Sequence, residues 1–169
     1  NLGADYVVHF QGAYENTIRR CRFYGTTTAA TFEKGRGRYL FRSPNNTFTD
    51  CMMSIEAWGD ANGEQQAHGL RDSSRFNLFL RDTMLLGMTS KASRRALLSQ
   101  SGTWPGTTGY NSWVDCYYKS FAVRDGGSTC SFEFQDNTNG GLVQGCQFIS
   151  RASTAISWSG SGAPDSMVV

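Results

Sequence analysis

The chain has 169 residues, of which 39% are hydrophobic, enough to fill the core of one domain over residues 1–169. Its formal net charge of +2 at pH 7 gives no global attraction for nucleic acid or an anionic membrane. No window approaches the roughly 18 apolar residues of a membrane span, and we expect no membrane insertion. With 19 Gly, 3 Pro and 13% aromatic residues, the composition favours short strands joined by tight turns.

An eight-residue pattern recurs five times along the chain. The copies start at positions 16, 46, 77, 111 and 141, so their starts are separated by 30, 31, 34 and 30 residues. A nearly constant period of this length is typical of stacked supersecondary units. The copies are Asn16–Phe23, Asn46–Met53, Asn77–Met84, Asn111–Tyr118 and Gly141–Phe148.

Within each copy the third and eighth residues are large and apolar, and the sixth is Cys except at Asp82. An odd spacing between inward positions breaks strand alternation, which predicts a bend between two short strands. The third residues should form one interior column. Its members are Ile18, Phe48, Phe79, Trp113 and Val143.

A further apolar strand precedes each copy, and residues 165–169 begin a sixth one. These strands are Val8–Phe10, Tyr39–Phe41, His68–Leu70, Ala96–Leu98, Phe132–Phe134 and Ile156–Trp158. Alternation places Val8, Phe10, Tyr39, Phe41, Phe132 and Phe134 inside. Equal coils stack so that equivalent strands pair in parallel at about 4.8 Å. Loops are expected at 26–38, 56–66 and 102–110.

The sequence therefore predicts an all-β fold, a parallel β-helix of about six coils with three short strands per coil. The phrase Asn-x-Ile-x-x-Cys-x-Phe resembles the pectate-lyase-like right-handed parallel β-helices, which include bacteriophage tailspikes and polysaccharide lyases. The resemblance covers nearly the whole chain. It is specific for the fold but not for activity, because the motif consists of core residues.

What the resemblance implies is a homotrimer on a virion tail or outside the cell, with glycan sites on a helix face or between subunits. Cysteines on neighbouring coils indicate assembly in a reducing cytoplasm. The chain begins almost directly in a strand and stops on Met167-Val168-Val169 without a recognisable polar cap. We therefore expect a fragment of a longer fibre or spike. Outward Leu40 and Leu97 indicate that some face is covered.

Arginines on one outward column are candidates for binding an acidic sugar, because a guanidinium binds a carboxylate through two hydrogen bonds. Arg42 and Arg71 fall on adjacent coils of this column, whose members are Gln11, Arg42, Arg71, Ser99, Gln135 and Ser159. The alternative is a solvated face on which arginines cover apolar surface. Trp58 and Trp104 lie in expected loops, where their rings would offer platforms to sugars.

Catalysis on a glycoside needs two flanking carboxylates, or a base with a cation for elimination. Asp72 follows Arg71, while Glu133 and Asp136 lie near the same face two coils on. Glu133 projecting outward beside Arg71 is the sharpest catalytic hypothesis. The alternative is that these carboxylates only keep the surface solvated.

No metal or cofactor is expected. Asp60 and Asn62 mimic the start of a calcium loop that lacks its other ligands, and the Cys column reads as small buried hydrophobes. His68 falls in a core-facing column. Residues 34–38 form a basic run in a loop, too short to indicate nucleic acid.

Three functions are compatible with this pattern. The leading hypothesis is a segment of a viral spike or fibre that binds, and in a catalytic form degrades, a bacterial surface polysaccharide. The second is a secreted polysaccharide lyase, hydrolase or epimerase. The third is a structural β-helix of a capsid, fibre or adhesin without a ligand.

Overall fold

The computed structural model describes residues 6–29, 35–59, 65–71, 73–88, 94–100, 109–120, 130–135, 141–150, 154–159 and 167–168. Over these ranges the regular structure consists of strands in parallel sheets, and no helix occurs. The same described ranges hold no helix long and apolar enough to cross a membrane. The protein is therefore all-β in the part that the structure describes.

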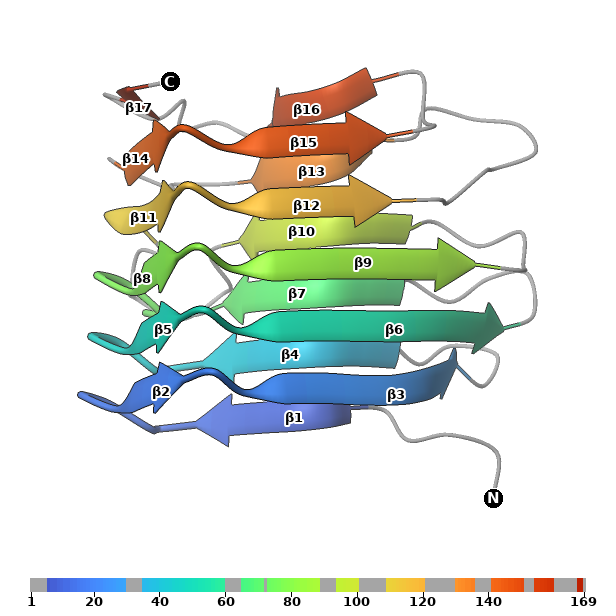
Figure 1. Cartoon of the computed structure of the whole chain (residues 1–169), viewed down its shortest axis with the longest axis horizontal. Coiled ribbons are helices and arrows are strands. Elements are labelled where there is room, and N and C mark those ends of the chain that lie inside the picture. Colours follow the sequence, from blue (N-terminus) through green and yellow to red (C-terminus); the bar gives the residue numbers. More distant parts are fainter. Residues whose placement is uncertain are drawn as a thin grey trace.

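The strands form three open parallel sheets, each a stack of strands; in Figure 1 sheet C is in front, sheet A lies behind it and sheet B is at the left. Sheet A consists of β1 (Tyr6–Gln11), β4 (Gly35–Phe41), β7 (Gln65–Arg71), β10 (Arg94–Gln100), β13 (Cys130–Gln135) and β16 (Thr154–Ser159). Sheet B consists of β2 (Thr17–Arg19), β5 (Thr47–Thr49), β8 (Leu78–Leu80), β11 (Asn111–Val114), β14 (Gly141–Gln144) and β17 (Met167–Val168). Sheet C consists of β3 (Arg22–Ala29), β6 (Met52–Gly59), β9 (Thr83–Met88), β12 (Tyr117–Ser120) and β15 (Gln147–Ser150).

The chain visits the sheets in the order A, B, C and then returns to A one strand further along the stack. We call each such set of strands a rung, so that β1, β2 and β3 form rung 1, and β16 and β17 belong to rung 6. The three strands expected for each repeat are thus present in rungs 1 to 5. The final β17 pairs with β14, as expected for the start of a sixth copy.

The predicted interior column is confirmed by the register of sheet B. Ile18 pairs with Phe48, Phe48 with Phe79, Phe79 with Trp113, and Trp113 with Val143. The rings of Phe48, Phe79 and Trp113 stack at centroid distances of 5.3 and 5.6 Å. These three side chains are almost fully buried, so stacked aromatic rings form the centre of the hydrophobic core.

The predicted bend between sheets B and C is a single residue in the left-handed conformation on every rung. Its φ angles lie between 49° and 63°, at Arg20, Asp50, Arg81, Asp115 and Gly145. A non-glycine residue in this conformation costs roughly 1–2 kcal/mol. Inter-rung hydrogen bonds accompany the bends of rungs 1 to 4, as when the Arg81 amide donates to the Val114 carbonyl at 2.8 Å.

A ladder of buried asparagines closes the opposite end of sheet B. The backbone amide of Asn46 donates to Oδ1 of Asn77 at 2.9 Å, and the backbone amide of Asn77 donates to Oδ1 of Asn111 at 2.9 Å. Asn16 donates to Asn46 in the same way. The first residue of the repeat is therefore Asn because its side chain satisfies the backbone of the preceding rung.

The sheet A register shows that the expected alternation of β4 was wrong. Val8 pairs with Arg38, and Phe10 pairs with Leu40. Arg38 and Leu40 are fully buried and take the interior positions of β4. Tyr39 is also buried, at 5% exposed, but it does not belong to the core cluster, and Phe41 is only half-buried. Leu40 is a core residue and gives no sign of a covered outer face. The expectation for Leu97 concerns a side chain that the structure does not describe.

Two expected loops are shorter than the spacing indicated. β3 continues to Ala29 and β4 begins at Gly35, while β6 continues to Gly59 and β7 begins at Gln65. Arg36 and Arg38 therefore belong to a strand, whereas Lys34 lies outside the described residues. The glycines on both sides of Arg36 predict a turn, but the segment pairs in parallel with β1 and β7 and is therefore a strand.

Candidate functional site

The structure separates the two arginines that were expected to share a column. Arg71 pairs with Phe41, so it is Phe41 that shares a column with Gln11 and Arg71. Arg42 follows the end of β4 with a φ of 50°, and its guanidinium lies 4.9 Å from the centre of the Phe41 ring. Ser99 pairs with Leu70, which also removes it from that column. Arg42 thus covers an apolar ring, as the alternative interpretation had it.

The candidate catalytic carboxylates are only partly placed. Glu133 lies in β13, where it pairs with Leu98 and Ser157, whereas Arg71 pairs with Gln100 on β10. Glu133 and Arg71 therefore belong to different columns, on strands separated by β10. The side chains of both, and the whole of Asp72 and Asp136, lie outside the described part of the chain.

The two candidate tryptophans differ in their positions. Trp58 belongs to β6 and pairs with Thr28, so the expectation that it lies in a loop was wrong. Its side chain is not among those described, and Trp104 lies outside the described residues. The aromatic rings that the structure does place at the surface are others.

An exposed aromatic ridge runs along the corner where the chain passes from sheet A to sheet B. We define the aromatic ridge as Tyr14, Arg75, Phe76 and Tyr110. Tyr14 is 66% exposed, and Phe76 and Tyr110 are each 50% exposed. The Phe76 and Tyr110 rings stack on adjacent rungs, with centroids 5.2 Å apart and planes 14° from parallel. The Arg75 guanidinium lies 5.6 Å from the centre of the Phe76 ring.

The backbone at this corner makes the two aromatic residues unusual. Phe76 and Tyr110 have φ angles of 56° and 54°, and the equivalent residues Glu15 and Asn45 have 58° and 57°. This position has the left-handed conformation on rungs 1 to 4, and Gly or Asn is the least strained choice for it. Bulky aromatic residues there are outliers, and strain of this kind clusters at functional sites. Because these rings are half-exposed, their burial offsets only part of that strain.

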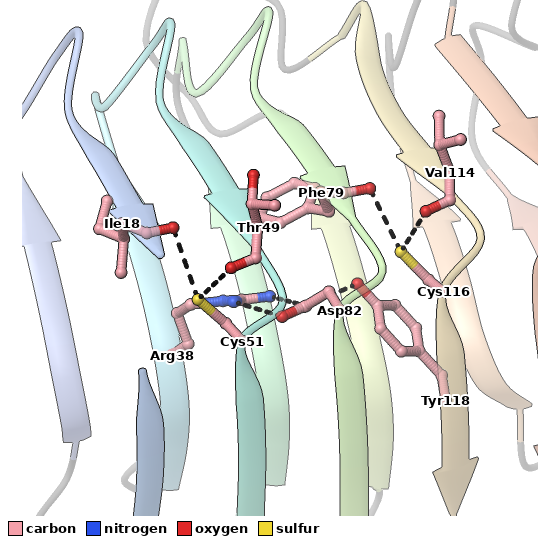
Figure 2. A network of polar contacts seen from close by, with 9 residues as sticks. All are labelled: Ile18, Arg38, Thr49, Cys51, Phe79, Asp82, Val114, Cys116 and Tyr118. Carbon is pink, nitrogen blue, oxygen red and sulfur yellow. Dashed lines mark hydrogen bonds and ion pairs between the residues drawn. The ribbon is translucent and has the colours of Figure 1, made fainter. Parts of the chain in front are cut away.

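A second polar group, inside the core, is fully enclosed. Figure 2 shows Arg38 of β4 and Tyr118 of β12 both directed at Asp82, which lies between β8 and β9. Arg38 donates to Asp82 through Nη2 at 2.5 Å and Nη1 at 3.2 Å, and the Tyr118 hydroxyl donates to Asp82 at 3.1 Å. All three residues are 0% exposed.

Physical surroundings fix the charge states in this buried group. Burial, with the negative charge of Asp82 adding to it, raises the pKa of Tyr118 well above 10.0, so the hydroxyl stays a donor. Burial would lower the pKa of Arg38, but Asp82 more than offsets it, and the guanidinium remains charged, 4.5 Å from the centre of the Phe48 ring and 4.9 Å from that of the Phe79 ring. A ligand in solution has no access to this group, whose role is therefore structural.

Cysteines at the same corner of the interior also have a structural role. Figure 2 shows the thiol of Cys51 against the carbonyls of Ile18 and Thr49, each at 3.5 Å. Cys116 meets the carbonyls of Phe79 and Val114 at 3.2 and 3.4 Å. The small thiol thus fills the bend and donates weakly to two rungs, as the structural interpretation of this column expected.

Sequence reasoning missed the aromatic ridge, although a signal for it was present. The residue before each repeat's Asn is Glu15 or Asn45 on the first two rungs, then Phe76 and Tyr110. An aromatic residue at this turn position, where the first two rungs have a polar residue, indicates a ring that the core does not bury.

Comparisons of this chain with family models, with curated proteins and with solved structures found no match. The geometry of the described residues is therefore the basis for a function.

Proposed function

We propose that this chain is a segment of a right-handed parallel β-helix in which each rung is one coil and sheets A, B and C are its faces. Support comes from the regular return of the chain to sheet A one strand further along the stack. Crossover connections between parallel strands of one sheet are right-handed in nearly all proteins, which favours that hand here.

The β-helix, in our proposal, belongs to a viral tailspike or fibre of a bacteriophage and binds a host surface polysaccharide along the aromatic ridge. The observation that carries this proposal is the stacked, half-exposed pair Phe76 and Tyr110 at strained backbone positions. Aromatic rings offer apolar faces to sugar rings, and Arg75 adds hydrogen-bond donors beside them.

The ridge also has the extended form that a polymeric ligand requires. Its residues come from rungs 1, 3 and 4, which are spaced by about 4.8 Å per rung along the stack. Asn45 supplies a polar side chain on the intervening rung 2 and Glu15 supplies one on rung 1, and both are exposed. A chain of sugars lying along the corner would meet rings and hydrogen-bonding groups in turn.

The experiment is to measure glycan binding by the wild-type chain and by Phe76→Ala and Tyr110→Ala variants. Loss of one stacking ring should cost about 1 kcal/mol, which weakens affinity roughly fivefold to tenfold. Tyr24→Ala is the matched control, because Tyr24 is 60% exposed on the outer side of sheet C, away from the ridge. Affinity that is the same for all three variants would remove the ridge as the binding site.

A glycan array on which the intact wild-type chain binds nothing would contradict the proposed function and favour a structural element instead.

A further inference from the structure

Two cysteines lie on adjacent rungs where the chain passes from sheet B to sheet C. Cys116 stands between β11 and β12, and Cys146 stands between β14 and β15. The residues that follow them, Tyr117 and Gln147, pair in register, and the Gln147 amide donates to the Cys116 carbonyl at 2.8 Å. Cys116 and Cys146 are therefore stacked directly on each other, 30 positions apart in the chain.

The spacing of these stacked residues fits a disulfide bond. Paired strands lie about 4.8 Å apart, and the α-carbons of disulfide-bonded cysteines usually lie roughly 4.4–6.8 Å apart. The backbone amide of Cys116 donates to the Cys146 sulfur at 3.4 Å, and the two thiols share a further hydrogen bond. Rotation of the side chains is therefore enough to bring the sulfur atoms together.

The two thiols differ in charge and in exposure. A hydrogen bond from the Cys116 thiol, with another from its backbone amide, lowers the pKa of Cys146 to about 7, although partial burial opposes this. The hydrogen bond between the thiols and burial together raise the pKa of Cys116. Cys116 is 2% exposed, whereas Cys146 is only half-buried. A reagent in solution thus reaches the sulfur that more readily becomes a thiolate, which is the nucleophilic form.

We propose that Cys116 and Cys146 are a redox-reactive pair, which low-molecular-weight disulfides convert into a disulfide bond between rungs 4 and 5. The Cys146 thiolate attacks one sulfur of the small disulfide, which forms a mixed disulfide and releases a first small thiolate. Cys116 passes its proton to that thiolate and attacks the Cys146 sulfur, which breaks the mixed disulfide and releases a second small thiolate. This second thiolate takes up the proton that Cys146 gave to the solvent. The protein is oxidised by two electrons, and the small disulfide is reduced to two thiols.

The cysteines of rungs 1 and 2 have the same stacking but the opposite order of exposure. Cys21 of rung 1 is half-buried and Cys51 of rung 2 is buried. There the sulfur that the neighbouring backbone amide approaches belongs to Cys51, and burial raises its pKa. The accessible sulfur and the sulfur that accepts this hydrogen bond are therefore different atoms, so this pair should react more slowly.

This inference goes beyond the proposed glycan binding and does not depend on it, since neither cysteine belongs to the aromatic ridge. A disulfide at this corner would tie rung 5 to rung 4 and restrict the unfolded chain. A chain that folds with reduced thiols would thus become more stable once it meets an oxidising solution.

The test is to incubate the reduced wild-type chain with oxidised glutathione and to map its cysteines by mass spectrometry after proteolysis without reduction. We expect a cross-link between Cys116 and Cys146 that forms faster than any cross-link between Cys21 and Cys51. The melting temperature should rise by roughly 5–10 °C and fall again on reduction. An oxidised chain in which Cys116 and Cys146 stay unlinked, or in which Cys21 and Cys51 link first, would overturn the proposal.

Two variants assign the roles of the two sulfur atoms. Cys116→Ser should stop at the mixed disulfide, with one glutathione on Cys146, and Cys146→Ser should lose both the cross-link and the rise in melting temperature. Cys21→Ser is the matched control and should form the cross-link at the wild-type rate. A Cys116→Ser chain without glutathione on Cys146 would contradict the attacking role of Cys146. The wild-type mapping needs no variant, so it decides the proposal even where a variant fails to fold.

Discussion

At the scale of single residues, the most consequential feature is the buried pair formed by Arg38 and Asp82. Asp82 stands at the sixth repeat position, which is Cys in the other four copies, and the structure buries it there. The sequence predicted that Arg38 lies in a loop, which was wrong, since it belongs to β4. The two residues lie 44 positions apart, so no local pattern could connect them, and only the stacking of rungs 2 and 3 brings them together.

We predict that Asp82→Asn destabilises the protein by about 3–5 kcal/mol, because it leaves a buried guanidinium without its counter-charge. Asp50→Asn is the matched control, since Asp50 forms an exposed ion pair with Arg81 at 2.6 Å and should matter far less. Denaturant unfolding would measure both variants.

The double variant Arg38→Met/Asp82→Cys should recover most of that loss, since it puts apolar groups where both charges were and restores Cys to its column. A double variant no more stable than Asp82→Asn alone would show that the pair itself supplies the stability.

At the scale of elements, the left-handed corners decide where each strand ends. The sequence indicated a bend between the third and sixth repeat positions, and the single residues of the B–C corner confirm it. The phase of β4 could not be read in the same way, because Arg38 to Phe41 offers a large side chain at every position. Only the register with β1 and β7 selects Arg38 and Leu40 as the inward pair.

Gly145→Ala should be more destabilising than Gly12→Ala, although both glycines have φ near 60°. A β-carbon on Gly145 would collide with the Asp115 carboxylate, whereas one on Gly12 would meet nothing within 4 Å. Because the exposed Asp115 side chain can rotate away from the added carbon, we expect a difference of about 0.5–1.5 kcal/mol in the free energy of unfolding.

Thermal or denaturant unfolding of the two variants gives the comparison. Adding Asp115→Ala to Gly145→Ala should remove most of the difference, and a difference that persists would assign it to the backbone instead.

At the scale of the whole molecule, stability is expected to be highest in the middle of the stack. Amides of Thr47, Leu78 and Ser112 each donate to the preceding rung at 2.8–2.9 Å, and rungs 2 to 4 have neighbours on both sides. Each rung contacts only its neighbours, as in other stacked repeats. The repeat period in the sequence predicted this arrangement, since it depends on like residues meeting at equal intervals.

We predict that amide hydrogen exchange is slowest in β5, β8 and β11 and faster in β1, β2 and β17. Exchange rates measured by NMR or mass spectrometry check this directly. Uniform protection across all rungs would mean that the stack opens only as a single cooperative unit.

The aromatic ridge belongs to this scale as well, because its rings come from different rungs and become neighbours only when the rungs stack. Within a single repeat, Phe76 and Tyr110 have no visible relation to each other. The sequence instead predicts sugar-binding residues on loops and on sheet A, and the sheet A residues depended on which side chains of β4 point inward.

One consequence follows from the Arg38, Asp82 and Tyr118 group. Asparagine, thiol and apolar ladders look alike from one level to the next, so a chain displaced by a whole repeat, or threaded into a neighbouring molecule, would satisfy them almost equally well. The acid, its guanidinium partner and the phenol occur together once among the described residues, on three successive levels. In a displaced chain the two opposite charges would be buried apart from each other in apolar surroundings, which costs free energy. The group therefore favours the native alignment of the repeats over displaced ones.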